Sequence, residues 1–321
     1  MLLAGDIGGT KTLLGLFHSS LSRPKAITIK TYQTNDFSSF SQLLDAFQRD
    51  VSVSLPIEAI VFGVAGPVVD QKTQLTNIPW NISAVEISKF YNLERVRLIN
   101  DLEAIAHSIE VLDQKEFFIL QAGKKDETGN AVIIAAGTGL GEVLLHRVNE
   151  KLNPIPSEGG HADFAPRTKR EKELVRTLQE RCGRVTIEQV LSGRGLVNLH
   201  HFTHAKYPCD AISAKKLTPA LISQAGLKGH CSACAETLEL FVSAYGSETG
   251  NLALRGVASS GVFIGGGIAP KILQSLSKGS FMEAFRNKPP MIKLLSQFPV
   301  KVILNDEAGL IGAAVFANAL C

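Results

Sequence analysis

The chain has 321 residues, of which 45% are hydrophobic and 20% are charged, and its formal net charge is +3. That length is sufficient for two domains with substantial cores, and the composition is that of an ordinary globular protein. The charge is spread along the chain without a basic block or an arginine-rich arm. Neither nucleic acid nor an anionic membrane is therefore expected as a partner.

Cysteine usage and hydropathy bear on the compartment. The five cysteines are an odd number in a long chain, which favours reduced thiols. The N-terminus lacks a signal-peptide pattern, because Leu2 to Ala4 enter a strand almost at once. No apolar run approaches the roughly 20 residues that a membrane span needs. We expect a soluble, cytoplasmic protein.

The opening segment, Leu2 to Phe17, predicts a buried strand, a glycine-rich turn and a second strand folding back on the first. Gly8 and Gly9 allow backbone N–H groups to face an anion closely, as a loop that binds phosphate requires. Asp6 follows the apolar run and is well placed to hold a divalent cation through water. The segment predicts a phosphate loop, with a structural hairpin as the alternative.

Other glycine loops fit this segment less well. A Walker A loop needs glycine where Thr10 stands and must open a helix, whereas Leu13 to Phe17 predict a strand. The G-x-G-x-x-G pattern of dinucleotide-binding proteins is absent. The run from Asp6 to Lys11, D-I-G-G-T-K, resembles the strand–turn–strand phosphate loop of the sugar kinase, actin and Hsp70 fold.

Strands and helices then alternate, which predicts an α/β domain. The expected strands are 26–32, 58–64 and 95–99, and the expected helices are 36–53 and 83–91. A second round follows, with a strand at 130–136, a glycine turn at 137–141 and a returning strand at 142–148. Recurrence of the opening architecture about 130 residues later is typical of a duplicated domain.

The rest of the chain predicts mainly helices. Expected helices are 169–181, 186–191 (capped by Thr186), 235–254 and 309–319, the last packed on the first domain; a peripheral helical insertion is expected at about 200–235. A strand from Gly261 runs into a glycine turn before Pro270, which suits the first turn of a helix. The last expected strand is 300–304.

Asn100 and Asp101 directly follow an expected strand. Asn100 and Glu103 form an N-x-x-E pattern that resembles a capping box. Asp101 then lies at a helix N-terminus, where the helix dipole favours its carboxylate form. A carboxylate held there can take a proton from an attacking hydroxyl, the task of a base in phosphoryl transfer. Simple helix capping is the alternative.

The segment from Ser157 to Phe164 contains Glu158 and His161 separated by two glycines. This spacing lets both side chains point at one small polar object such as a sugar, whose hydroxyls both donate and accept hydrogen bonds. A metal site would need further ligands at close spacing.

A second metal interpretation concerns Cys231 and Cys234, which lie near His230 and near His200, His201 and His204. One C-x-x-C is half a zinc site, and residues 235–241 predict a helix start. The sequence therefore favours no metal there.

Together these segments resemble the bacterial glucokinase family, in the group without the zinc motif of the ROK kinases, over essentially the whole chain. The resemblance rests on Gly5–Thr10, Ile99–Ala104, Gly137–Gly141, Ser157–His161, Thr186–Gly193 and Gly265–Ile268. In ROK sugar kinases a cysteine-rich zinc loop precedes a glutamate. Here Cys182 precedes Glu188, but Val185 to Ile187 provide no thiols, so no zinc is expected in that loop.

The resemblance implies a fold. It is the two-lobed, duplicated ribonuclease H-like α/β fold of actin-like ATPases and hexokinases, with the active site in the interlobe cleft. The small lobe would comprise 1–110 and 306–321, with the first phosphate loop and the catalytic aspartate. The large lobe would comprise 111–305, with the second phosphate loop, the sugar cluster, the adenosine loop and the insertion.

The resemblance also implies a reaction, the ATP-dependent and Mg²⁺-dependent phosphorylation of D-glucose at the 6-hydroxyl, which feeds glycolysis. Asp101 resembles the general base. The matches to the sugar ligands are Asn100, Glu158, His161 and Glu188. The matches to the nucleotide ligands are Gly5, Asp6, Ile7, Gly8, Gly9, Thr10, Gly137, Thr138 and Gly139 at the phosphates and Gly265 and Gly266 near adenosine, with Asp6 also near Mg²⁺.

The family further implies a homodimer. One alternative is a kinase for another hexose, such as mannose or an N-acetylated amino sugar. A sugar sensor without catalysis is less favoured, because no helix-turn-helix precedes Leu2 and no basic patch occurs. The Glu158–His161 segment argues against an actin-like filament or a chaperone ATPase.

Overall fold

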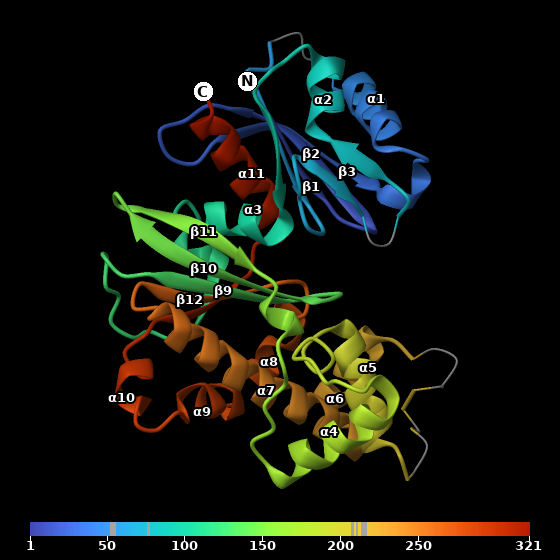
Figure 1. Ribbon diagram of the computed structural model, residues 1–321, viewed down its shortest axis with the longest axis vertical. Helices are drawn as coiled ribbons and strands as arrows, with labels where there is room; N and C mark the ends of the chain where they lie inside the picture. Colours follow the sequence, from blue (N-terminus) through green and yellow to red (C-terminus); the bar gives the residue numbers. More distant parts are fainter. Residues whose placement is uncertain (52–55, 76–77, 207–208, 210, 213–216) are drawn as a thin grey trace. The chain divides into compact units, whose positions relative to one another are not determined.

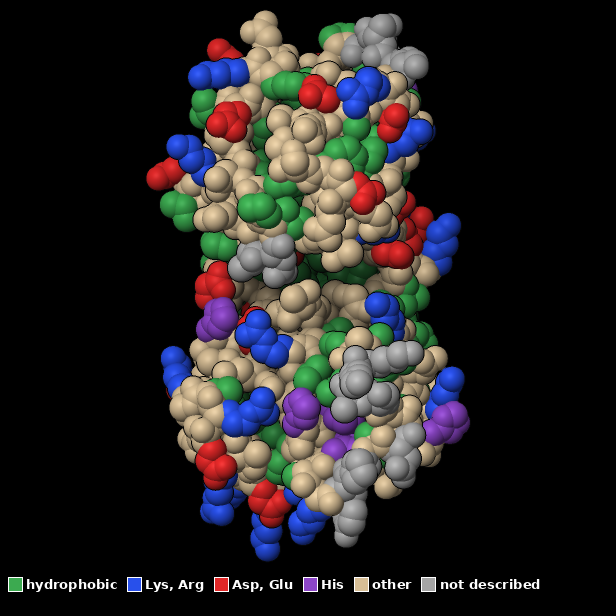
Figure 2. Space-filling view, turned by 90° about the vertical axis from the view of Figure 1, so that its right-hand side faces the viewer, with side chains coloured by type: hydrophobic (Ala, Val, Ile, Leu, Met, Phe, Trp, Pro, Cys, Tyr) green, Lys and Arg blue, Asp and Glu red, His purple; other side chains and the backbone are tan. Residues whose placement is uncertain are grey.

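The computed structural model describes residues 1–51, 56–75, 78–206, 209, 211–212 and 217–321 (Figure 1). These residues form two compact units, 1–116 with 305–321, and 117–304. The lobes expected from the sequence were 1–110 with 306–321, and 111–305, so the observed first unit extends further at both junctions. Within the described ranges, no helix combines the length and apolarity that crossing a membrane requires. Acidic and basic side chains both occur across the face drawn in Figure 2.

The first unit is built on a five-stranded sheet in the order β3-β2-β1-β4-β7. Its strands are β1 (Leu2–Ile7), β2 (Lys11–His18), β3 (Lys25–Gln33), β4 (Ala59–Val64) and β7 (Val96–Asn100). β1 runs antiparallel to β2 and parallel to β4, which is parallel to β7. The register places Ile7, Val64 and Asn100 side by side at the carboxyl ends of the three parallel strands. Residues that follow these ends therefore meet at one edge of the sheet, where open α/β sheets bind ligands.

Helices cover both faces of this sheet (Figure 1). The helices are α1 (Phe40–Asp50), α2 (Ala84–Tyr91), α3 (Asp101–Ser108) and α11 (Ala308–Ala319). Alternate residues of a strand point to opposite faces. Leu3 and Ile7 accordingly pack with α1 and α2, while Leu2 and Ala4 pack with α3 and α11. A small hairpin of β5 (Lys72–Gln74) and β6 (Asn81–Ser83) completes the unit, with short 3₁₀ turns at 34–36 and 114–116.

The second unit contains a six-stranded sheet in the order β11-β10-β9-β12-β13-β8. Its strands are β8 (Phe117–Gln121), β9 (Ala131–Ala136), β10 (Leu140–Val148), β11 (Lys151–Ser157), β12 (Gly261–Gly265) and β13 (Val300–Ile303). β9 is antiparallel to β10 and parallel to β12, which is parallel to β13. This is the pairing that β1, β2, β4 and β7 show in the first unit.

Seven helices lie among the described residues of the second unit. They are α4 (Lys169–Cys182), α5 (Gly193–Thr203), α6 (Pro219–Lys228), α7 (Ser232–Gly256), α8 (Leu273–Leu276), α9 (Ser280–Arg286) and α10 (Ile292–Leu295). The long helix α7 is central, because Phe241, Val242 and Tyr245 join the strands to the surrounding helices in one apolar core. Short 3₁₀ turns occupy 159–161 and 269–272.

One predicted element is wrong. Residues 186–191 do not form a helix; Thr186 makes an isolated bridge with Asp163, and a turn follows. The Thr186 N–H donates to Gln189 Oε1, and no helix follows for Thr186 to cap. The helix expected at 36–53 begins only at Phe40, after a 3₁₀ turn. Residues 52–53 of that prediction, and 207–208, 210 and 213–216 of the expected insertion, lie outside the described residues.

Candidate active site

The first predicted phosphate loop is a tight turn held by a buried threonine, Thr34, which directly follows β3. The Gly8 N–H donates to the Lys11 carbonyl at 3.1 Å. Thr34 Oγ1 donates to the Gly8 carbonyl at 2.9 Å, and the Thr34 N–H donates to the Thr10 carbonyl at 2.9 Å. Thr12 Oγ1 lies 3.0 Å from Thr34 Oγ1. The turn therefore has a fixed shape before any ligand binds.

The residues of this segment differ in accessibility. Gly5 and Ile7 are buried within β1, and a Cβ on Gly5 would lie 2.6 Å from the Phe62 ring. Gly9 is half-buried and Thr10 is exposed. Direct contact with an anion is thus open to the turn rather than to the strand before it.

Asn100 and Asp101 stand where β7 passes into α3. Asn100 Oδ1 accepts hydrogen bonds from the N–H groups of Leu102 and Glu103, at 2.9 Å and 3.4 Å. Glu103 Oε2 accepts in turn from the Asn100 N–H, which confirms the predicted capping box. The Asn100 amide also donates to the Gly66 carbonyl at 3.2 Å. These bonds fix the helix start and hence Asp101, whose Oδ1 accepts from the Leu102 N–H at 2.8 Å.

Asp6 and Asp101 form an electrostatically coupled pair at this edge of the sheet. Burial raises the pKa of Asp6 to about 7, and repulsion from Asp101 adds to the effect, against the attraction of Lys11. Burial likewise raises the pKa of Asp101, although its hydrogen bonds with Leu102 and Asn100 act in the opposite direction. Two carboxyls that resist ionising together indicate a site suited to a cation or to a transferred proton.

A glycine of the C-terminal helix shapes the same place. A Cβ on Gly309, in the first turn of α11, would lie 2.8 Å from Asp6 Oδ2. Only glycine thus leaves the Asp6 carboxylate in its observed position. This contact could not be predicted from the sequence, because Asp6 and Gly309 lie near opposite ends of the chain and only the packing of α11 on β1 brings them together.

In the second unit, the turn from Gly137 to Gly139 is built against Glu188. The Gly137 N–H donates to the Gly139 carbonyl at 2.9 Å, and the Gly193 N–H donates to the Gly137 carbonyl at 2.8 Å. Glu188 Oε2 accepts from the Leu140 N–H at 3.0 Å. A Cβ on Gly139 would lie 2.6 Å from that oxygen, so glycine is needed for this approach. Thr138 is exposed at the tip.

Glu158 and His161 are brought beside this turn by backbone hydrogen bonds. The Glu188 N–H donates to the Gly160 carbonyl at 2.8 Å, which ties the Glu158–His161 segment to Glu188. His161 Nε2 lies 3.9 Å from Glu158 Oε2, and both side chains are exposed. The structure thus gathers three of the predicted sugar ligands, namely Glu158, His161 and Glu188, around the turn at 137–139. The fourth, Asn100, lies in the first unit.

The predicted adenosine loop follows β12. Gly265 pairs with Ala135, so the loop leaves the same edge of the sheet as the Gly137 turn. Gly266 has φ +81°, a conformation that side chains rarely adopt, and it lies against the Ala136 carbonyl. Tyr245, a buried residue of α7, places its hydroxyl 3.2 Å from the Ala136 nitrogen and supports this edge. Sequence reasoning missed Tyr245, since an aromatic residue at helical spacing is typical of any core.

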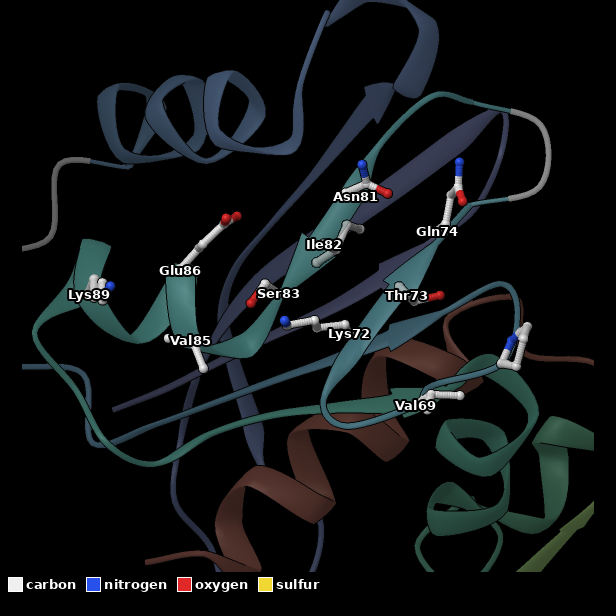
Figure 3. Close-up of a pocket in the computed structure, with 11 residues that line it drawn as sticks. Val69, Lys72, Thr73, Gln74, Asn81, Ile82, Ser83, Val85, Glu86 and Lys89 are labelled. Carbon is white, nitrogen blue, oxygen red and sulfur yellow. The ribbon is translucent and has the colours of Figure 1, made fainter.

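A groove of the first unit lies elsewhere. It has a volume of about 710 Å³ and is lined by the β5–β6 hairpin and the start of α2, including Lys72, Asn81 and Glu86 (Figure 3). None of the predicted site residues lines it. The size of this groove is a weaker indication of a functional site than the two neighbouring carboxyls of Asp6 and Asp101.

The comparisons with known proteins agree with these features. A family model described as glucokinase matches residues 3–320. A relative named glucokinase from Trichormus variabilis is 37% identical, and the match covers all of this chain and 99% of the relative. The chain belongs to the glucokinase family.

Solved structures place this glucokinase-family chain among sugar kinases. The crystal structure of a glucokinase from an Antarctic psychrotroph has a TM-score of 0.87 and 31% identity, and the match covers 99% of this chain and 98% of that one. A ROK family glucokinase from Streptomyces griseus, solved with glucose and AMPPNP, has a TM-score of 0.67 and 22% identity, with 99% of each chain covered. The mixed α/β fold is therefore that of the sugar kinases.

Proposed function

We propose that this chain transfers the terminal phosphoryl group of ATP to the 6-hydroxyl of D-glucose, giving glucose 6-phosphate and ADP. Membership of the glucokinase family supports the reaction. The observation that carries the mechanism is the half-buried carboxyl of Asp101 at the start of α3, beside Asp6 and at the carboxyl ends of β1, β4 and β7.

Asp101 is proposed as the general base. Its carboxylate accepts the proton of the sugar hydroxyl, the hydroxyl oxygen forms a bond to the terminal phosphorus, and the bond from that phosphorus to the bridging oxygen breaks to release ADP. A raised pKa makes the Asp101 carboxylate a stronger base than an exposed aspartate. The capping network of Asn100 and Glu103 holds it in place.

Sugar recognition is assigned to Asn100, Glu158, His161 and Glu188. Carboxylates accept hydrogen bonds from sugar hydroxyls, while amide and imidazole N–H groups donate to them. The hydrogen bonds that join Glu188 to Gly160 and Leu140 support this role, because they fix the carboxylate relative to the Glu158–His161 segment. Groups that a bound sugar covers, and that then need a hydroxyl partner, can discriminate against sugars lacking that hydroxyl by a factor of roughly 10⁴.

Nucleotide binding is assigned to the turns at 8–10 and 137–139 for the phosphates, and to Gly265 and Gly266 for adenosine. Asp6 suits a place beside Mg²⁺, because a half-buried carboxylate repelled by a second one favours a divalent cation with oxygen ligands. When bound, Mg²⁺ would neutralise charge on the phosphates. The contribution of the chain itself is to hold Asp6 and the turns in fixed positions.

The two units are proposed as the lobes of a duplicated ribonuclease H-like fold. The matching pairing of β1, β2, β4 and β7 with β9, β10, β12 and β13 supports duplication. In this proposal each unit supplies residues that bind the substrates. A homodimer is also expected from the family, and light scattering coupled to chromatography would measure it.

The deciding experiment measures ADP release from Mg·ATP with a panel of hexoses, for the wild type and the Asp101→Asn variant. We expect glucose-dependent release, and a kcat roughly 10²- to 10⁴-fold lower in the variant, since that is the usual contribution of a general base. Asp45→Asn, at an exposed position of α1, is the matched control and should retain full activity.

Other outcomes would change the proposal in defined ways. Faster release with mannose or an N-acetylated amino sugar would keep the mechanism and change the substrate. Binding of glucose and ATP without any sugar-dependent release would overturn the kinase assignment in favour of a sensor.

A further inference from the structure

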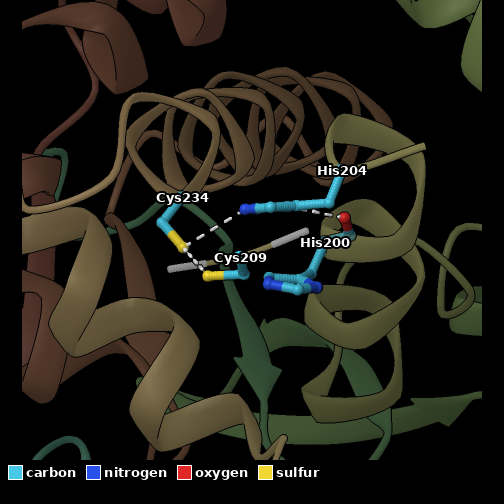
Figure 4. Close-up of side chains that lie close together, drawn as sticks. All are labelled: His200, His204, Cys209 and Cys234. Atoms are coloured by element: carbon cyan, nitrogen blue, oxygen red, sulfur yellow. Dashed lines mark hydrogen bonds between the residues drawn. The ribbon is translucent and has the colours of Figure 1, made fainter. Parts of the chain in front are cut away.

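Cysteine and histidine side chains converge in the helical part of the second unit, away from the residues assigned above. His200 lies in α5, and His204 is the residue that ends this helix. Cys231 caps the N-terminus of α7, Cys234 lies in its first turn, and Cys209 lies in the connection between α5 and α6. Figure 4 shows four of these side chains pointing toward one another from three separate segments.

The distances among the potential ligand atoms are those of a small metal site. One ligand atom each from His200, His204, Cys209 and Cys234 lies within 4.8 Å of all the others. Cys209 Sγ is 3.6 Å from Cys234 Sγ, and Cys234 Sγ is 3.7 Å from His204 Nε2. Cys231 Sγ is 3.3 Å from the same nitrogen. A tetrahedral zinc ion separates two sulfur ligands by roughly 3.8 Å and sulfur from nitrogen by roughly 3.6 Å.

His204 has the second-shell contact typical of a metal ligand. Its Nδ1 lies 2.9 Å from the His200 carbonyl oxygen. Ligating histidines commonly donate the N–H of the other ring nitrogen to a carbonyl, which fixes the tautomer and the orientation of the ring. With the proton on Nδ1, the lone pair on Nε2 faces Cys231 and Cys234.

His200 is buried without a hydrogen-bond partner. Its side chain is 6% exposed, and neither ring nitrogen has a partner among the described residues. The ring stacks on that of His204, with centroids 3.8 Å apart. A buried, unpaired imidazole is costly unless something binds it.

We propose that this cluster binds one zinc ion through Cys209, Cys234 and His204, with Cys231 or His200 as the fourth ligand. Either set supplies four nitrogen and sulfur donors, which is the chemistry of a closed structural zinc site. Cys209, Cys231 and Cys234 are free thiols.

The zinc ion has a structural role in this proposal. The apolar cluster around it is small, with Ile212, Ile222, Ala225 and Cys234 as its buried members. A small core gains most from a metal that crosslinks it. The ion would join the end of α5 to the start of α7, and the start of α5 supports the Gly137 turn through Gly193. The C-x-x-C and histidines disfavoured as a metal site on sequence grounds are thus brought together by folding.

The test is metal content, measured independently of sugar phosphorylation. The full chain, produced without a histidine tag and kept reduced, is freed of metal with a chelator, incubated with excess Zn²⁺ and desalted. We expect one zinc per chain by mass spectrometry of the metal, and a Co²⁺ form with the visible absorption of tetrahedral cobalt–thiolate. Zinc should also raise the melting temperature of the metal-free protein.

The chain offers matched controls, because two of its five cysteines lie outside the cluster and are exposed. Cys182→Ser and Cys321→Ser should each retain one zinc, whereas the double variant Cys209→Ser, Cys234→Ser should lose it. Loss in either Cys231→Ser or His200→Phe identifies the fourth ligand. The site would be overturned if the reduced wild type held no stoichiometric zinc or if the double variant kept its zinc. Retention of zinc in both Cys231→Ser and His200→Phe would also overturn it. The cobalt spectrum of the wild type decides the matter even where a variant does not fold.

Discussion

The carboxyl of Asp6 shows how one residue of the site depends on a distant one. Its position at the end of β1 follows from the strand pattern, and its ionisation depends on burial and on Asp101. Its orientation depends on Gly309, the only residue type that leaves room for Oδ2 at this contact. The sequence predicted a role for Asp6 but could not predict the neighbour that positions its carboxylate.

Gly309→Ala is predicted to reduce activity while preserving the fold. The added methyl group displaces the Asp6 carboxylate, and the substitution otherwise improves helix propensity by about 1 kcal/mol. We expect kcat/KM for Mg·ATP to fall at least about tenfold, as small misplacements of positioning groups usually cost, with an unchanged or higher melting temperature. Steady-state kinetics and thermal unfolding of the same preparation would measure both; unchanged kinetics would contradict the role given to Gly309.

Glu142 on β10 is a buried acid outside the proposed chemistry, with a predictable effect on stability. Its side chain is 1% exposed, and Oε1 has no hydrogen-bond partner among the described residues. Burial raises the pKa of Glu142 to about 7, and repulsion from Glu248 adds to it, against the attraction of Arg255. Arg255 lies closer to Glu248, at 2.9 Å, than to Glu142, at 3.7 Å.

Glu142→Gln is therefore predicted to stabilise the protein at alkaline pH. Below about pH 4.5 the acid is protonated in both states, and between about 4.5 and 7 only the folded state keeps the proton. Wild-type stability accordingly falls as pH rises through this window, and the variant avoids the loss. We expect a gain on the order of 2 kcal/mol at pH 8 and little gain at pH 4.5, measured by urea unfolding at both values. An equal gain at both would contradict it.

At the scale of whole elements, the sequence predicted helices and strands correctly where the periodic spacing of apolar residues was strong. The strands around both glycine turns, the long helix α7 and the closing helix α11 follow directly from apolar spacing. The strand β11 was missed, because Pro154 and Pro156 argue against a central strand. It pairs with β10 alone, at the edge of the sheet, where proline is tolerated. Residues 186–191 mimic a helix, but the N–H groups of Ile187 and Glu188 donate to the carbonyls of Ala162 and Gly160, so only a short turn forms after them.

The packing of α11 on α3 depends on Gly312. A Cβ there would overlap the Ala104 carbonyl of α3, and backbone cannot move aside as a side chain can. Gly312→Ala is predicted to destabilise the protein by at least about 2 kcal/mol, because overpacking exceeds the gain in helix propensity. Gly309→Ala is the matched control, one turn earlier on the same helix. Denaturant unfolding of the two variants should give shifts of opposite sign or clearly different size; equal shifts would count against this packing argument.

At the scale of the whole molecule, the chain passes from one unit to the other and returns. The second unit is continuous in sequence and its core draws only on residues between 117 and 304. The first unit is not: Leu310, Ala313, Ala314 and Ala317 of α11 cover the face of β1 that Leu2 and Ala4 present. Sequence reasoning anticipated that the last helix returns to the first domain, because the duplicated fold implied by the resemblance requires it. It could not anticipate the zinc cluster, whose ligands come from three segments joined only by folding.

This difference in continuity predicts how fragments behave. Residues 117–304 should fold alone, with a cooperative thermal transition, since every side chain of their main core is retained. Residues 1–116 should not fold alone, because without α11 an apolar sheet face is left in water at about 25 cal/mol per Å² of exposed surface. A permuted fragment, with 305–321 joined through a Gly/Ser linker ahead of residue 1, restores the missing helix and should fold.

Circular dichroism and calorimetry of the three fragments would test this. Cooperative unfolding of 1–116 by itself would show that α11 is dispensable to that core, and failure of the permuted fragment alone would show that covering the face is insufficient.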